Sequence, residues 1–116
     1  MKPTALFIIT GDPRASPRPA EAVRIAAGIG AWQRIDVTIY LRARAVLVLS
    51  EFPEELVDAD NFDRYLPIVK EWGRQVYVQR GAPELAEIGL AAVAYREISD
   101  SELARLTARQ DYIMRF

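Results

Sequence analysis

The amino-acid sequence predicts an α/β domain, in which helices cover both faces of a mainly parallel, five-stranded sheet to make a three-layer sandwich. Short apolar or β-branched runs alternate with helical patterns along the chain, and this alternation is typical of parallel sheets. The first of these runs, residues 5–10, is continuously apolar until glycine and proline end it, as in strands buried on both faces. With 51% hydrophobic residues, 116 residues suffice for one core. We therefore expect a single domain over residues 1–116.

The first third of the chain predicts two strands and a helix between them. The first strand leads into a loop, residues 11–19, that carries three prolines. Pro19 is well placed as the first residue of a helix that runs to about Gly30, because proline is favoured at the first helical position. The small residues of this helix indicate close packing on the sheet. Residues 35–41 are β-branched and aromatic, which predicts the second strand.

The middle of the chain contains one open question and one helix. Residues 45–49 are five apolar residues that fit a third strand or a short helix or turn over the sheet edge equally well. Six acids in residues 51–63 predict a solvated loop. A helix follows, because apolar side chains keep helical spacing at Phe62, Tyr65, Leu66, Val69 and Trp72. Pro67 must lie in its first turn or kink it, and Gly73 ends it.

The last third predicts three strands and two helices. Residues 75–79, 91–98 and 112–114 have the composition of strands, and residues 83–89 that of a short helix. Ser99 and Glu102 have the spacing of a capping box, which predicts the start of another helix. Leu103 and Leu106 would then face inward.

Cysteine and histidine are both absent. Without a thiolate the chain can form no persulfide, redox switch or disulfide, and without imidazole no side chain has an ordinary pKa near 7. Only Lys2 and Lys70 offer side-chain amines, and their surroundings favour solvated positions over activated ones. The sequence therefore points to no catalytic residue and to no cofactor, and an enzyme ranks behind the other functions considered below.

The charge balance predicts no nucleic-acid or membrane partner. With 15 basic and 16 acidic residues the net charge is −1, so no overall field attracts the protein to an anionic surface. The N-terminal apolar run is shorter than the core of a secretory signal, and no stretch is long enough to span a bilayer. We expect a cytoplasmic protein.

Two segments that follow predicted strands are candidate binding sites. Gly11 and Asp12 follow the first strand, and Gln79, Arg80 and Gly81 end a strand that we expect to be central. Parallel sheets bind ligands at the carboxyl ends of their strands. Arg80 can bind an anion or an acidic partner, although an arginine followed by glycine also fits a plain turn. The first segment lacks the spacing and the lysine of a phosphate-binding P-loop.

Two other segments only imitate known motifs. Residues 28–33 begin like a dinucleotide fingerprint, but they close a helix instead of following a strand. Residues 58–63 carry alternating carboxylates, but Phe62 occupies a ligand position and the turn glycine of a calcium loop is missing. We therefore predict no metal site.

Several segments, in this order, resemble the DsrE/DsrF family, and within it the TusC or DsrF type of subunit from sulfur-relay complexes. The segments are residues 7–19, residues 21–26, Ala45 with Val46, Arg80 with Gly81, and residues 111–116. The ending is the most telling, because chains of this type finish with an aspartate, an apolar strand and a terminal phenylalanine. The similarity covers nearly the whole length.

This resemblance implies a flavodoxin-like domain that assembles into trimers or hexamers, often with DsrE-like and DsrH-like relatives. In the sulfur-carrying members a cysteine ends the strand before the arginine–glycine turn, and that position is Gln79 here. An amide cannot carry sulfane sulfur, because the carrier must be a thiolate. Arg44 is a second departure, since relatives commonly have an acidic or small residue there.

Two functions follow as hypotheses. The first is a non-catalytic DsrF/TusC-like subunit that shapes an oligomer and positions a cysteine-bearing partner, with Tyr65, Trp72 and Phe116 as candidate interface anchors. The alternative is a homo-oligomeric protein that binds a small molecule or anion through the 11–19 loop and residues 79–81.

Overall fold

A computed structural model describes residues 2–72 and 76–116, and in these residues five parallel strands form one sheet. The strands lie in the order β4-β3-β2-β1-β5, and all four pairings are parallel. Their bounds are β1 (Thr4–Ile9), β2 (Asp36–Leu41), β3 (Val76–Gln79), β4 (Tyr95–Ile98) and β5 (Tyr112–Arg115). The predicted α/β class is confirmed.

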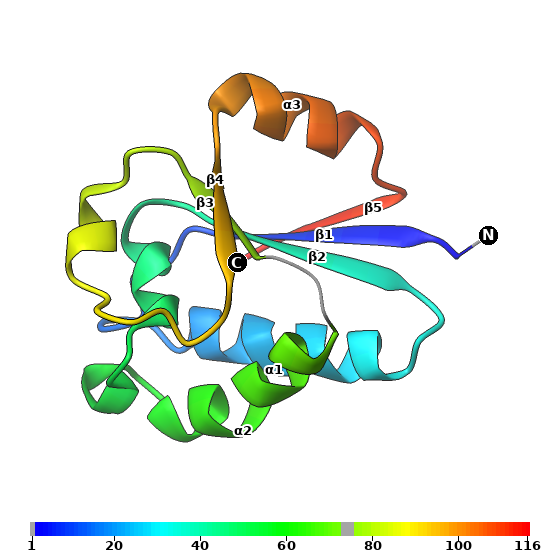
Figure 1. Cartoon of the computed structure of the whole chain (residues 1–116). Coiled ribbons are helices and arrows are strands. Elements are labelled where there is room, and N and C mark those ends of the chain that lie inside the picture. The colour runs from blue at the N-terminus through cyan, green and yellow to red at the C-terminus, as the bar shows by residue number, and fades with distance from the viewer. Residues whose placement is uncertain (1, 73–75) are drawn as a thin grey trace.

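Helices cover both faces of this sheet (Figure 1). Helices α1 (Arg18–Ala31) and α2 (Ala59–Glu71) lie on one face, and α3 (Asp100–Ala108) lies on the other. The strand order explains this arrangement. From β1 to β4 the chain adds strands in one direction, and α3 then returns it to the opposite edge, where β5 pairs with β1. Right-handed crossovers place helices on opposite faces when the direction reverses, so three layers result.

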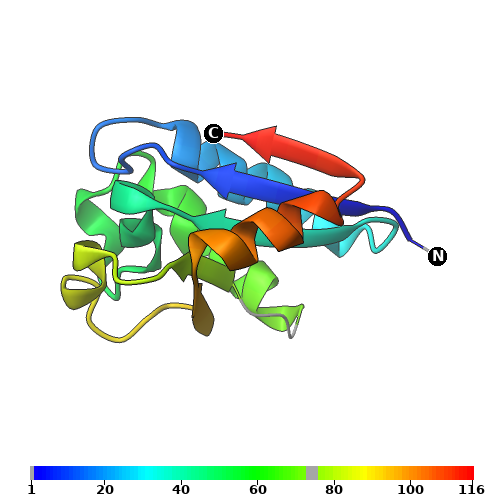
Figure 2. The ribbon, with the colours of Figure 1, turned by 90° about the horizontal axis from the view of Figure 1, so that it is seen from above.

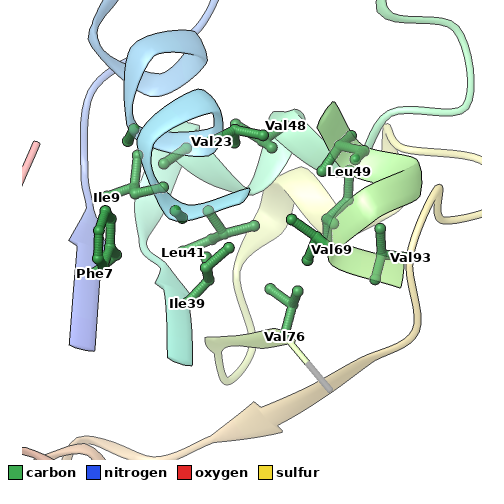
Figure 3. Packing of buried hydrophobic residues seen from close by; sticks show 14 of the residues in the cluster. Phe7, Ile9, Val23, Ile39, Leu41, Val48, Leu49, Val69, Val76 and Val93 are labelled. Atoms are coloured by element: carbon green, nitrogen blue, oxygen red, sulfur yellow. The ribbon is translucent and has the colours of Figure 1, made fainter. Parts of the chain in front are cut away.

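The larger core lies between the sheet and helices α1 and α2 (Figure 3). Alternate residues of each strand point to this side, so Phe7, Ile9, Ile39, Leu41 and Val76 pack together there. Helix α1 brings the small residues that the sequence analysis expected, because its buried positions are mostly alanine. Small side chains allow the helix axis to approach the sheet closely.

Among the residues that the structure describes, α3 is the helix that covers the opposite face of the sheet. Leu6, Ile8, Tyr40 and Ile98 are buried there, and Leu103 and Leu106 of α3 are partly buried against them. A helix is about 10 Å wide, whereas five strands spaced at about 4.8 Å span roughly twice that width. Figure 2 shows α3 running obliquely across the sheet from the end of β4 toward β5. One helix therefore leaves part of this face uncovered.

Helix α3 begins with the capping box that the sequence predicted. The Ser99 hydroxyl accepts a hydrogen bond from the Glu102 backbone N–H at 3.2 Å, and the Glu102 carboxylate accepts one from the Ser99 backbone N–H at 3.1 Å. Two backbone donors at the exposed start of the helix are thus satisfied.

The open question at residues 45–49 is resolved in favour of the helical alternative. Residues Ala43–Leu49 form a 3₁₀ segment, η1, and Ala45 to Leu49 are all buried. A second short 3₁₀ segment, η2 (Pro53–Glu55), precedes α2.

Helix α2 begins at Ala59, earlier than predicted, so part of the expected acidic loop is helical. Of the two alternatives for Pro67, a place in the first turn is excluded, because Pro67 lies inside the helix. Pro67 and Asp63 are both exposed, so water can solvate the Asp63 carbonyl that has lost its N–H partner. Gly73, the predicted end of the helix, lies outside the described residues.

Two elements near the carboxyl half are shorter than predicted. The helix expected over residues 83–89 is a single 3₁₀ turn, η3 (Pro83–Ala86). The strand expected over 91–98 includes only β4, because Ala92 donates its backbone N–H to the Leu49 carbonyl of η1 at 3.1 Å instead of pairing with β3. Among the described residues, no helix is long and apolar enough to cross a membrane.

Candidate functional site at the carboxyl ends of the strands

The fold brings both predicted segments to the same edge of the sheet. Gly11 and Asp12 follow β1, whereas Gln79, Arg80 and Gly81 lie at the end of β3. Strand β2 lies between them, so the turn after β2 separates the two segments.

The side chain of Gln79 holds that turn. Its amide oxygen accepts a hydrogen bond from the backbone N–H of Ala43 at 2.9 Å. Ala43 has a φ of +54°, a left-handed conformation that costs an alanine roughly 1 kcal/mol. The amide therefore braces a strained turn between β2 and η1.

The turn after Gln79 is tied to the neighbouring elements. The Arg80 guanidinium lies 2.8 Å from the Glu102 carboxylate of α3. The backbone N–H of Gly81 donates to the Glu97 carboxylate of β4 at 2.9 Å. Gly81 has a φ of +73°, so this turn needs a residue without a side chain. The cation proposed for binding an anion is already paired within the chain.

Arg44 is the centre of a cluster of three acids from two segments, the loop after β1 and the η3 turn. Its guanidinium lies 3.7 Å from Asp12, 3.5 Å from Glu84 and 3.6 Å from Glu87. Glu87 also pairs with Arg14 at 3.4 Å, and Glu84 is only 8% exposed. Asp12 further accepts the Arg14 backbone N–H at 2.9 Å. Arg44, the residue that departs from the family pattern, is thus paired with Asp12, which the sequence analysis named, and with Glu84 and Glu87, which it did not single out.

A third ion pair joins β2 to the start of α3. The Arg42 guanidinium donates to the Tyr40 hydroxyl at 3.0 Å and to the Asp100 carboxylate at 2.8 Å. Burial raises the pKa of Tyr40, and the hydrogen bond from Arg42 lowers the pKa of Asp100. The hydrogen bond from the Ser99 backbone lowers the pKa of Glu102. Because the pKa values of Asp100 and Glu102 are lowered, both carboxyl groups stay ionised at pH 7 and are poor general acids.

The crevice between β1 and β5 is the point where the direction of strand addition reverses, and such points commonly bind ligands. Here the chain's own Phe116 lies in it. Its carbonyl accepts the backbone N–H groups of Thr10 at 2.8 Å and Gly11 at 3.3 Å. Its ring stacks on Phe7 with a centroid distance of 5.5 Å, and the Arg18 guanidinium lies over the ring. Two backbone donors at the start of the 11–19 loop are therefore occupied.

The charged side chains at this edge brace it. Arg42, Arg44 and Arg80 each face a carboxylate at this edge. Within residues 2–72 and 76–116, no cluster of acids is placed to hold a metal ion. The signal for these pairs is present in the sequence as opposite charges after successive strands, but their pairing depends on the strand order, which the sequence alone left open.

The three candidate interface anchors, Tyr65, Trp72 and Phe116, are partly buried against the core of their own chain. Their role between subunits stays a prediction. Large apolar side chains that the sequence analysis did not select are more exposed, and they are Trp32, Phe52, Leu90, Tyr112 and Ile113.

The fold and this edge define a flavodoxin-like, three-layer α/β domain. Among solved structures, it is similar to the crystal structure of the YchN protein from E. coli, with a TM-score of 0.76 over 100% of both chains and 18% sequence identity. This likeness and the parallel sheet confirm the predicted flavodoxin-like α/β fold. No family model and no curated protein sequence matches the chain.

Proposed function

We propose that the chain is a non-catalytic, DsrF/TusC-like subunit of a cytoplasmic oligomer of the sulfur-relay type, with DsrE-like or DsrH-like neighbours that carry the sulfur. The proposal depends on Gln79. By the resemblance it takes the position where the sulfur-carrying relatives have cysteine, and in the structure its amide oxygen accepts the Ala43 backbone N–H. Neither its chemistry nor its hydrogen bonding suits sulfane transfer.

Two further observations support an assembly role. The DsrE/TusC-like fold of YchN makes a sulfur-relay relative the first expectation. Arg42, Arg44 and Arg80 form ion pairs within the chain at the strand ends, so these cations have partners without a ligand. An edge whose charges are paired internally suits a subunit that positions a neighbour.

Native mass spectrometry of the purified chain, alone and after co-expression with DsrE-like and DsrH-like proteins, tests the proposal. We expect a trimer, a hexamer or a mixed complex that contains this chain. A species that stays at 13.1 kDa in every combination would overturn the proposed function.

Anion binding is the second candidate function, and a different place favours it. A groove of about 650 Å³ lies between α3 and the sheet, with Tyr77 and Ile98 on the strand side. Arg96, Arg105 and Arg109 line it. Glu102 is the one acid among its lining residues, and Arg80 already pairs with it at 2.8 Å. The groove therefore carries an excess of positive charge that a small anion would balance.

Isothermal titration with inorganic pyrophosphate tests this second candidate. The expected result is binding that weakens at least about tenfold in Arg105→Ala, where Arg105 faces the groove. Arg64→Ala is the matched control, because Arg64 is an exposed arginine of α2 on the other face. Equal binding by both variants would mean that pyrophosphate is attracted by general charge and would exclude this groove.

A further inference from the structure

The groove between α3 and the sheet lies where this helix leaves part of the sheet face uncovered (Figure 2). Its volume is about 650 Å³, which falls in the range of small-molecule sites, roughly 300–1,000 Å³. An inorganic anion such as pyrophosphate is far smaller and would leave most of this space empty. The groove therefore has room for a ligand with a body as well as a charged group.

The cations of the groove come from both of its walls. Arg96 lies on β4, whereas Arg105 lies in α3 and Arg109 directly follows that helix. Residues four positions apart face the same side of a helix, so Arg105 and Arg109 lie next to each other along the groove. A cation near the end of a helix is favourable, but two cations at this spacing repel each other. An anion between them would relieve that repulsion.

The one carboxylate among the described lining residues, that of Glu102, already has partners. It lies 2.8 Å from the Arg80 guanidinium and 4.0 Å from that of Arg96. Within residues 2–72 and 76–116, neither Arg105 nor Arg109 forms an ion pair with a carboxylate. Arg109 donates its Nε–H to the backbone carbonyl of Arg105 at 3.3 Å, which leaves its other donors available. Two guanidinium groups of the groove thus lack an anionic partner in the chain.

The groove also has an apolar surface, to which Tyr77, Ile98 and Leu106 contribute. Ile98 is buried, whereas Tyr77 and Leu106 are only partly buried. Tyr77 and Arg96 are register partners of β3 and β4, so their side chains lie side by side on the same face of the sheet. Planar rings stack on aromatic side chains and on guanidinium groups. This surface therefore favours a flat, apolar body over a flexible polar one.

We propose that the groove binds a planar aromatic anion, that is, a ring system that carries a phosphate, sulfonate or carboxylate group. The anionic group pairs with the guanidinium groups of Arg105 and Arg109, because arginine donates parallel N–H groups to two oxygens of such an anion. The ring lies against Tyr77 and Leu106. The inference rests on the second candidate function, anion binding in this groove, and names the class of anion.

Anilinonaphthalene sulfonate is a direct probe, because it is a planar aromatic anion whose fluorescence increases in an apolar site. Phenylnaphthylamine has the same rings without the sulfonate and is the matched neutral probe. We expect the sulfonate to bind with a Kd at least about tenfold lower than that of the neutral probe. Arg105→Ala should raise the Kd of the sulfonate at least about tenfold and leave that of the neutral probe unchanged. Arg64→Ala, on the other face, should change neither.

Two alanines of α3 test where the probes bind. Ala108 lines the groove, whereas Ala104 is exposed on the same helix and is not among the described lining residues. Ala108→Phe places a ring in the groove and should weaken the binding of both probes. Ala104→Phe is the matched control and should leave both unchanged. Circular dichroism and the urea midpoint show whether each variant keeps the native fold.

The two proposals for this groove fail in different ways. Sulfonate binding that neither Arg105→Ala nor Ala108→Phe weakens would place the probe on another surface and overturn this inference. Pyrophosphate binding that depends on Arg105, without any binding of the sulfonate, would also overturn it, while anion binding by the groove stands. If neither anion binds, the inference and the second candidate function both fail.

Discussion

Replacing Gly30 by alanine should destabilise the protein, although alanine is the better helix former. Gly30 lies in the last turn of α1. A Cβ built on it would overlap the indole ring of Trp72, at the end of α2, with the ring atom Cη2 only 2.9 Å away. The indole would have to leave α1, and the contact between the two helices would open.

The expected magnitude is the difference between two opposing effects. Alanine gains roughly 0.5–1 kcal/mol over glycine inside a helix, whereas forcing extra volume into a packed contact costs about 1–3 kcal/mol. We therefore expect Gly30→Ala to lose about 1 kcal/mol. Gly28→Ala is the control in the same helix, because nothing lies within 4 Å of a Cβ there, and it should gain about 0.5–1 kcal/mol.

Urea unfolding and thermal melts measure this contrast. A difference of about 2 kcal/mol between the two variants corresponds to a Tm difference of roughly 8 °C for a domain of this size. The penalty should disappear when Gly30→Ala is combined with Trp72→Leu, since the clash is then removed. Equal stability of Gly28→Ala and Gly30→Ala would refute the packing of Trp72 on α1.

Three further changes test the bracing of the turns and of α3. Ala43→Gly should raise the urea midpoint, with a gain of up to about 1 kcal/mol in the free energy of unfolding, because φ at Ala43 is positive; a lower midpoint would contradict this strain. Ser99→Ala should lose about 1 kcal/mol, because it removes the capping hydroxyl of α3, and an unchanged Tm would argue against the capping box. The pKa of Glu102 is lowered in the folded state, so its contribution is complete above its ordinary pKa and disappears as the pH falls through the acid range. Glu102→Gln should therefore differ from the wild type in urea midpoint at pH 7 and approach it near pH 3, and a gap that persists at low pH would contradict this assignment.

The sequence predicted those parts of the fold that depend on local patterns. The β-branched run in 35–41 and the capping box at Ser99 formed as expected, because each carries its own signal. The run 45–49 could not be assigned, since five apolar residues satisfy a strand and a 3₁₀ turn alike. Its conformation follows from neighbours that are distant in sequence, such as the Gln79 amide on Ala43.

The sequence predicted where the candidate site residues lie in the fold, but not which side chains they contact. The sequence places Asp12 and Arg80 after predicted strands. Both residues lie at one edge of the sheet, because strands in a parallel sheet end on the same side. The partners Glu84, Glu87 and Glu102 come from segments whose proximity depends on the complete strand order. An arginine that looks available in the sequence can therefore already have a carboxylate partner in the fold.

The position of Phe116 couples the end of β1 to the crevice between β1 and β5. This single residue supplies the ring that stacks on Phe7 and the carbonyl that accepts the N–H groups of Thr10 and Gly11. Removal of the ring, as in Phe116→Ala, would uncover part of the core while the backbone carbonyl could still hold the end of β1. A substitution at the sheet edge would thus act as a core mutation, and the crevice between β1 and β5 would open to small molecules for the first time.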